Sequence, residues 1–414
     1  MHAEDVALPA IADAVGTPVY IYSAATIERH ARVFREALAP LHDPLIAYAV
    51  KANPNAAVLA TLARAGLGAD VVSGGELLRA CRAGIAADRI VFSGVGKTAE
   101  EMELALREGI YQFNLESEPE AEMLSAVATR LGTEAPIAFR INPDVDAGTH
   151  AKISTGKAEN KFGIPAASAV EACARAAALP GLRVQGIAVH IGSQLTSLQP
   201  LERAFATVGD TIRRLRAEGH RIDVADLGGG LGVPYDPTLP VPPSPADYGA
   251  MVVRATQGWD VRLVFEPGRV IVGNAGIMLT RVVRVKQGAG DPFVIVDAGM
   301  NDLMRPSLYD AWHDIRAVRP CGEAAIANVV GPVCETGDTF ATGRRMDRVA
   351  EGDLVAFMTA GAYAATMAST YNSRPLTPEI MVSGSSWAIV RERQRIEDMI
   401  GADIIPPWLE QEQS

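Results

Sequence analysis

The sequence predicts a (β/α)8 barrel followed by a separate β domain. Up to about position 270, short β-branched or apolar runs alternate with helix-like stretches, a pattern typical of parallel βα units. Beyond that point β-rich runs such as PFVIVDAG are separated by Gly, Pro and Asp turns. The length of 414 residues also exceeds the size at which single hydrophobic cores stop growing, which favours two domains.

Eight runs in the first part have the composition of strands. They are LIAYAV (45–50), GADVVS (68–73), RIVFSG (89–94), YQFNLE (111–116), PIAFRIN (136–142), VQGIAVHIG (184–192), VADLGG (224–229) and RLVFEPG (262–268). Eight strand–helix units within roughly 245 residues match a barrel of this type, which is typically about 250 residues long.

The segments between these runs carry helix start and stop signals. Thr98 with Glu101, and Ser117 with Glu120, have the spacing of capping boxes. The stretch PYDPTLPVPPSPADY (234–248) is rich in proline, and we expect it to lack regular structure. Four glycines stand where helices are expected to stop: Gly66, Gly84, Gly109 and Gly132.

Composition and charge exclude several classes of protein. A net charge of −11 repels phosphate backbones and anionic lipids, so neither nucleic acid nor a membrane is an expected partner. The N-terminus does not resemble a signal peptide, and no segment offers 18 uncharged apolar residues. Four widely spaced cysteines argue against a disulfide framework, which favours the cytoplasm. The seven histidines form no HExxH cluster, and no metal is expected.

Unusual residues fall at the ends of the predicted strands, where the active sites of such barrels form. Lys51 ends the first strand. Its ammonium would stand at the rim of a poorly hydrated cavity, where its pKa would fall and Schiff-base chemistry becomes feasible. The alternative for a strand-end lysine is a salt bridge. The glycines 228–230 end the seventh strand and could bind phosphate through backbone N–H groups, or could form a plain tight turn.

Two more strand ends complete the candidate site. Glu266, at the end of the eighth strand, would need a cationic partner if buried, either a protonated ring nitrogen or the nearby Arg269. His190 and Ser193 end the sixth strand, and His190 could lie against an aromatic ring or be a hydrogen-bonded core residue. A lysine for an imine, a glycine cradle, a carboxylate and a histidine together describe a pyridoxal phosphate pocket.

At these residues the sequence resembles the alanine-racemase-like class of pyridoxal phosphate enzymes, and in particular the diaminopimelate decarboxylase family. The likeness covers nearly the whole chain. The segments that carry it include YAVKANPN, DVVSGGEL, RINPDVDAGTHAKISTGKAENKFGI, HIGSQ, LGGGLG, EPGR, DLMRPSLYDAWH, GPVCETGD and YNSRP. CETGD and DLMRPSLYDAWH are the most particular to this family. One departure is Ala364, which replaces the usual glycine of the GAYG motif.

The resemblance implies a role for each site residue. Lys51 would hold pyridoxal 5'-phosphate as a Schiff base, His190 would stack on its ring and Glu266 would face the pyridine nitrogen. The cofactor set implied is Lys51, Asp70, His190, Ser193, Gly228, Gly229, Gly230, Glu266, Pro267, Gly268, Arg269 and Tyr363. The substrate set implied is Arg269, Arg305, Tyr309, Glu335 and Tyr363.

The resemblance also implies a homodimer with shared active sites. The CETGD loop would reach the site of the other subunit, where Cys334 would act as the acid and Glu335 would recognise the distal amino group. The alternative for Cys334 is a buried apolar thiol. The strand near VYIYS would join the β domain, which gives a barrel over 26–270 and a β-rich domain formed by 1–25 and 271–414.

The expected activity is decarboxylation of meso-2,6-diaminopimelate to L-lysine and carbon dioxide, the last step of lysine biosynthesis. Decarboxylation of a related amino acid remains open. So does a racemase on the same fold, for which Tyr363 could supply the second base. A non-catalytic protein of this fold would be expected to lack the lysine or the cysteine, and both are present.

Overall fold

The computed structural model describes residues 1–146, 148, 155–156 and 160–409 and divides into two compact units. One comprises residues 24–275 with 361–366, and the other comprises 1–23, 276–360 and 367 onward. The limits follow the elements, because helix α2 begins at Ala24 and strand β13 begins at Gly276. The division into domains at 26–270 stays a prediction.

The first unit is a closed parallel barrel, which confirms the predicted fold class. Its strands are β4 (Leu45–Ala49), β5 (Gly68–Val71), β6 (Ile90–Phe92), β7 (Gln112–Leu115), β8 (Ala135–Asn142), β10 (Leu182–Val189), β11 (Val224–Asp226) and β12 (Arg262–Phe265). Each lies within one of the runs of the sequence or within two residues of it. The barrel closes because β12 pairs with β4 and β10 pairs with β8. A two-residue strand, β9 (Ile164–Pro165), adds to β8.

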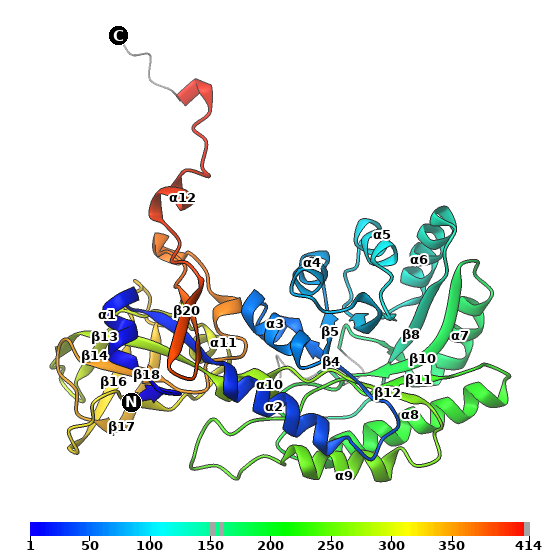
Figure 1. Ribbon diagram of the computed structural model, residues 1–414, viewed down its shortest axis with the longest axis horizontal. Coiled ribbons are helices and arrows are strands. Elements are labelled where there is room, and N and C mark those ends of the chain that lie inside the picture. The colour runs from blue at the N-terminus through cyan, green and yellow to red at the C-terminus, as the bar shows by residue number, and fades with distance from the viewer. Residues whose placement is uncertain (147, 149–154, 157–159, 410–414) are drawn as a thin grey trace. The chain divides into compact units, whose positions relative to one another are not determined.

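Helices follow the strands along the chain, and Figure 1 shows α4, α5 and α6 on the outside of the barrel. The helices are α2 (Ala24–Ala37), α3 (Ala56–Arg64), α4 (Gly74–Arg82), α5 (Ala99–Glu108), α6 (Glu118–Leu131), α7 (Ala169–Ala177), α8 (Gln199–Ala217), α9 (Pro245–Ala255) and α10 (Arg269–Val272). Within the described residues, none of the helices combines the length and apolar character needed to cross a membrane.

The predicted helix signals have mixed outcomes. The capping box of Thr98 and Glu101 is present, and α5 ends at Gly109 in the left-handed conformation. Ser117, in contrast, makes no capping hydrogen bond. The carboxylate of Glu120 instead accepts from the backbone N–H of Glu116 and pairs with the buried Lys97 at 2.6 Å. The second capping box was therefore wrong, because a buried cation competes for the carboxylate.

The proline-rich stretch 234–248 is also more regular than predicted, since α9 starts inside it. Ser244 caps this helix by accepting from the N–H of Asp247, whose side chain accepts in return from Ser244. Pro245 occupies the first turn, where a missing N–H costs nothing. The prolines thus set the start of a helix instead of excluding one.

The second unit is built on a sheet with the strand order β17-β16-β14-β13-β3-β19-β20. The strands are β3 (Val19–Ser23), β13 (Gly276–Lys286), β14 (Phe293–Val296), β15 (Ile315–Ala317), β16 (Ala324–Val330), β17 (Thr339–Asp347), β18 (Leu354–Phe357), β19 (Glu379–Ser383) and β20 (Ser386–Arg391). β3 lies between β13 and β19, which confirms that the N-terminal strand completes the β domain.

Short elements complete this unit. They are β1 (His2–Ala3), β2 (Val6–Ala7), α1 (Leu8–Val15), α11 (Arg305–Tyr309) and α12 (Ile396–Ile400). Leu8 and Ile11 of α1 are fully buried in one apolar cluster with Ile21, Leu279 and Ile380 of the sheet. The N-terminal segment is thus part of the core of this unit.

Candidate active site

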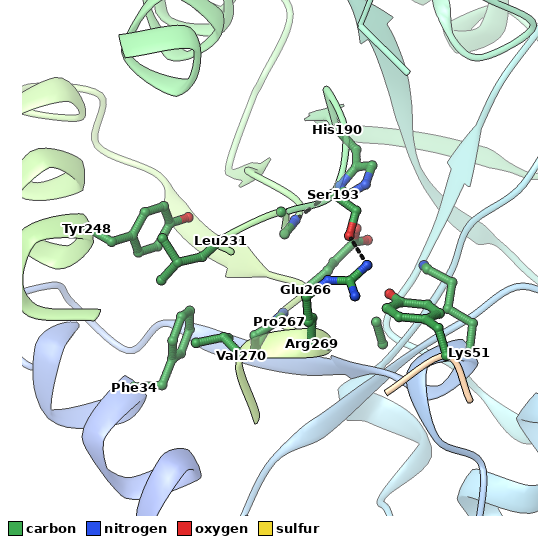
Figure 2. A pocket seen from close by; sticks show the side chains of 15 residues that line it. Phe34, Lys51, His190, Ser193, Leu231, Tyr248, Glu266, Pro267, Arg269 and Val270 are labelled. Carbon is green, nitrogen blue, oxygen red and sulfur yellow. Dashed lines mark hydrogen bonds between the residues drawn. The ribbon is translucent and has the colours of Figure 1, made fainter. Parts of the chain in front are cut away.

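The barrel brings the strand-end residues together in one pocket. Lys51 lies in the short turn of helix Val50–Ala52 that directly follows β4. The pocket is lined by Phe34, Ala49, Lys51, His190, Ser193, Gly229, Gly230, Leu231, Tyr248, Glu266, Pro267, Gly268, Arg269, Val270 and Tyr363. Figure 2 shows Phe34 and Tyr248 at the opposite end of this pocket from Lys51. The predicted barrel residues outside this lining, Asp70 and Gly228, contact or adjoin members of it.

The ammonium of Lys51 is paired with a carboxylate. Its Nζ lies 2.5 Å from Oδ2 of Asp70, a fully buried residue of β5. Burial lowers the pKa of Lys51, but the negative charges of Asp70 and Glu266 outweigh it and raise the pKa above its ordinary value. The predicted fall in this pKa was therefore wrong, because acidic residues on or next to the two strands that flank β4 lie close to the lysine.

Glu266 lies among buried polar groups that the sequence analysis missed. Its Oε1 accepts from Ser93 at 3.2 Å and from Asn114 at 3.3 Å. Its carboxyl group also hydrogen-bonds with Asp226, which accepts from Asn114 and from the N–H of Gly228. Burial and the charge of Asp226 raise the pKa of Glu266 well above its ordinary value. Burial raises the pKa of Asp226 as well, so this pair of carboxyl groups takes up a proton more readily than exposed carboxylates do.

Asn114 and Asp226 carried one signal that could have identified them. Each is a polar residue in the middle of a predicted barrel strand, and both side chains are almost completely buried. A polar residue at such a position needs a hydrogen-bond partner inside the barrel.

His190 is held as a neutral imidazole. The backbone N–H of Gly229 donates to its Nδ1 at 3.1 Å, so this nitrogen has no proton. Burial, and then the positive charges of Arg140 and Lys51, lower the pKa of His190 well below its ordinary value. Arg140 also donates from Nη2 to the carbonyl oxygen of His190 at 3.1 Å.

The glycine run forms a close-packed turn with no room for side chains. A Cβ on Gly229 would lie 2.1 Å from the carbonyl oxygen of Glu266, and one on Gly230 would lie 2.4 Å from Leu195. Gly228 adopts φ 64°, a conformation that favours glycine. The run therefore brings backbone to the edge of the pocket as only glycine can.

Hydrogen bonds to two hydroxyl groups hold the guanidinium of Arg269 in place. Its Nη1 donates to the hydroxyl of Tyr235 at 2.6 Å and its Nη2 to the hydroxyl of Ser193 at 3.1 Å, the bond dashed in Figure 2. Its guanidinium also lies over the ring of Tyr363, with 4.8 Å to the centroid. The predicted alternative of a Glu266–Arg269 salt bridge is not among the ion pairs of the described residues.

These residues fit a phosphorylated, aldehyde-bearing ring. Among the described residues, the buried Oδ1 of Asp70 and Nε of Arg269 have no hydrogen-bond partner. The pocket also has an amine at Lys51 and, at Gly229 and Gly230, a turn in which no Cβ separates the backbone from the pocket. An amine, a carboxyl group and an anion cradle are what pyridoxal phosphate requires of a protein.

Four predicted residues lie in the β-rich unit. Arg305 and Tyr309 are the first and last residues of α11, and Arg305 is buried. Cys334 is exposed, so the alternative of a buried apolar thiol was wrong. The carboxylate of Glu335 accepts from the hydroxyl of Tyr371 at 3.0 Å. The KISTGKAEN part of the resemblance lies mostly outside the described residues.

Comparison with known proteins sets the class first. Residues 24–273 match the family model described as "Pyridoxal-dependent decarboxylase, pyridoxal binding domain". The matched range coincides closely with the continuous part of the barrel unit, residues 24–275.

Full-length relatives narrow the class. The chain is 55% identical over 408 residues to the diaminopimelate decarboxylase of Zymomonas mobilis, covering 98% of this chain and 97% of that one. It is 49% identical to that of Pseudomonas fluorescens over 98% of this chain and 97% of the relative. The crystal structure of diaminopimelate decarboxylase from Helicobacter pylori complexed with L-lysine matches with a TM-score of 0.92 and 41% identity, covering 95% and 98%. The chain belongs to the diaminopimelate decarboxylase family.

Proposed function

We propose that this protein decarboxylates meso-2,6-diaminopimelate to L-lysine and carbon dioxide, with pyridoxal 5'-phosphate as cofactor. The observation that carries the proposal is the convergence of Lys51, His190 and Glu266 with a glycine turn on one pocket of a chain of this family. The relative from Helicobacter pylori that binds L-lysine supports the choice of product.

The barrel residues would hold the cofactor at both ends. Lys51 would supply the amine that holds the cofactor's aldehyde carbon, and Asp70, whose Oδ2 lies 2.5 Å from Nζ, would keep that amine in place. The turn 228–230 with Ser193, the segment 267–269 and Tyr363 would hold the phosphate. When bound, pyridoxal phosphate supplies an electron sink for the bond that breaks at the substrate's α-carbon.

Two side chains govern the ring itself. The carboxyl group of Glu266, whose pKa burial raises, would face the ring nitrogen and could share a proton with it. His190 is neutral and buried, so it can lie against the ring without adding a positive charge. Together they favour a ring that accepts electron density.

The substrate would be recognised by the β-rich unit as well. Arg269, Arg305 and Tyr309 would bind its carboxylate groups, because a guanidinium pairs with both carboxylate oxygens. Tyr363 would contact substrate and phosphate. Cys334 would return the proton that replaces carbon dioxide, and Glu335 would bind the distal amino group.

We also propose a cytoplasmic homodimer in which Cys334 and Glu335 act in the site of the other subunit. The exposure of Cys334 and Glu335 in the single chain supports this assignment. The barrel, 26–270, and the β-rich part, 1–25 with 271–414, would be its two domains.

The decisive experiment measures evolved carbon dioxide. Purified protein with pyridoxal phosphate is incubated separately with meso-diaminopimelate, ornithine, arginine and lysine. Release confined to diaminopimelate is expected. Release only from ornithine or arginine would overturn the substrate, and inversion of configuration without gas release would indicate a racemase.

A further inference from the structure

His313 holds Arg305 through a hydrogen bond inside the β-rich unit. Nη1 of Arg305 lies 3.0 Å from Nε2 of His313, and both side chains are at least nine-tenths buried. The other ring nitrogen, Nδ1, lies 2.9 Å from the carbonyl oxygen of Met358. A carbonyl oxygen can only accept and a guanidinium can only donate. The ring therefore carries its proton on Nδ1 and accepts from Arg305 at Nε2.

The backbone around His313 is itself fixed. Its carbonyl oxygen accepts from Nη1 of Arg344 at 2.7 Å, and the guanidinium of Arg344 lies over the ring of Trp312 at 4.1 Å. The backbone N–H of Met358 donates at 2.8 Å to the carbonyl oxygen of Asp314, the residue that follows His313 in the chain. The ring is thus anchored to β17 and to the end of β18 before it meets Arg305.

This arrangement suits an arginine that must bind an anion from outside. A neutral ring takes up one donor of the guanidinium without neutralising its charge, whereas a carboxylate in the same place would do so. A guanidinium whose plane is set in advance loses less freedom when it pairs with both oxygens of a carboxylate.

We propose that His313 is a positioning residue that orients Arg305 for binding a carboxylate group of the amino-acid substrate. The inference rests on the proposed function, in which Arg305 binds such a group. His313 is not among the residues proposed to contact cofactor or substrate, and its expected effect is on the affinity for substrate.

Two substitutions at position 313 separate the two ring nitrogens. His313→Asn keeps a donor near Nδ1 for Met358 but has nothing to accept from Arg305. His313→Gln places an amide oxygen near Nε2 and can still accept. Both are compared with Arg305→Met and with the double variant His313→Asn/Arg305→Met in the holoenzyme.

We expect His313→Asn to raise KM for meso-diaminopimelate about 10-fold or more, the usual loss for a hydrogen bond to a charged group. We expect kcat and the affinity for pyridoxal phosphate to stay close to the wild-type values. His313→Gln should restore most of the KM. The double variant should be no worse than Arg305→Met alone, because the histidine acts only through the arginine.

The outcomes are distinguishable. An unchanged KM in His313→Asn, beside a raised KM in Arg305→Met, overturns the inference and leaves the proposed function intact. Equal losses of KM, kcat and cofactor affinity in the Asn and Gln variants indicate a structural role and also overturn it. An unchanged KM in Arg305→Met overturns the inference together with the role of Arg305. Absence of carbon dioxide release by the wild-type protein overturns the proposed function.

If thermal unfolding shows that His313→Asn folds poorly, a second variant replaces it in the test. His313→Ala leaves space for water near Met358 and also removes the acceptor for Arg305. The same rise in KM with retained kcat supports the inference, and a KM equal to that of the wild type overturns it.

Discussion

Lys51 is subject to opposing effects that decide its chemistry. Burial favours the neutral amine, while Asp70 and Glu266 favour the ammonium. In the apoprotein the acidic residues have the larger effect, so the pKa of Lys51 is raised. His190 has no such compensation, since its neighbours Arg140 and Lys51 are both cationic. Two basic side chains of one pocket therefore shift in opposite directions, and each shift can be tested by substitution.

Lys51→Ala should abolish both the imine absorbance of the cofactor and the activity, because among the described residues that line the pocket only Lys51 carries an amine. Absorbance spectra and carbon dioxide release measure the two effects on the same sample. Retention of both would contradict the assignment of Lys51.

Asp70→Asn should lower the pKa of Lys51, because it removes the closest negative charge. Imine formation needs the neutral amine, so its onset should move to lower pH by about one unit or more. A pH titration of the imine absorbance measures the shift, with Asp223→Asn, an exposed position at the other end of the barrel, as the control. An onset at the wild-type pH would contradict the role of Asp70.

The depressed pKa of His190 should make the apoprotein less stable as pH falls. Below pH 6.5 the unfolded chain binds a proton at this residue and the folded chain does not, so the free energy of unfolding decreases with decreasing pH. Between pH 7.5 and pH 5.5 this lowers the free energy of unfolding by about 1 kcal/mol. Urea unfolding of the wild type and of His190→Gln at both pH values measures this loss. The free energy of unfolding should fall by that much less in the variant than in the wild type. Equal pH effects would contradict the shift.

At the scale of elements, the turns after the strands decide the site. The turn 228–230 comes shortly after β11. The backbone N–H of Glu266, which follows β12, donates to the carbonyl oxygen of Gly228 at 2.8 Å. In the same turn, the backbone N–H of Gly229 donates to Nδ1 of His190, the residue that follows β10. Three neighbouring strand ends are thus joined by one glycine segment, and a change in that segment should disturb all three.

Gly229→Ala should weaken cofactor binding at least about 10-fold and lower the melting temperature, since its Cβ would lie 2.1 Å from a backbone oxygen. Gly96→Ala is the matched control, because no atom lies within 4 Å of its added Cβ. Fluorescence titration with pyridoxal phosphate and thermal unfolding report the two effects. Similar behaviour of the two variants would contradict a special role for the turn.

At the scale of the whole molecule, the proposed assembly divides the chemistry between subunits. Lys51 belongs to the barrel unit and the exposed Cys334 to the β-rich unit. If both act in one site across a dimer, each heterodimer of two defective chains contains one intact site. Mixing experiments can therefore measure the sharing directly.

Lys51→Ala and Cys334→Ser proteins, each inactive, should regain activity when refolded or exchanged together. Random reassociation in a twofold dimer makes about one quarter of the sites intact, so about a quarter of the wild-type rate is expected. Light scattering confirms the dimer, and each variant alone is the control. No recovery in a sample that contains heterodimers would place Cys334 in the site of its own subunit.

The order of strands and helices and the location of the candidate site at strand ends follow from the sequence by itself. Backbone periodicity and the Gly and Pro signals depend on neighbouring residues, so the eight strand runs and the cap of Thr98 were predictable. So was the grouping of Lys51 with Glu266, because the carboxyl ends of parallel barrel strands share one mouth.

Only the tertiary structure decided which partners these residues have. Asp70 reverses the expected pKa shift of Lys51, Lys97 takes Glu120 from its predicted cap, and His313 meets Arg305. Each outcome depends on distances between side chains and on the water excluded around them. Local sequence patterns contain neither, because charge interactions and burial are set by how distant segments pack.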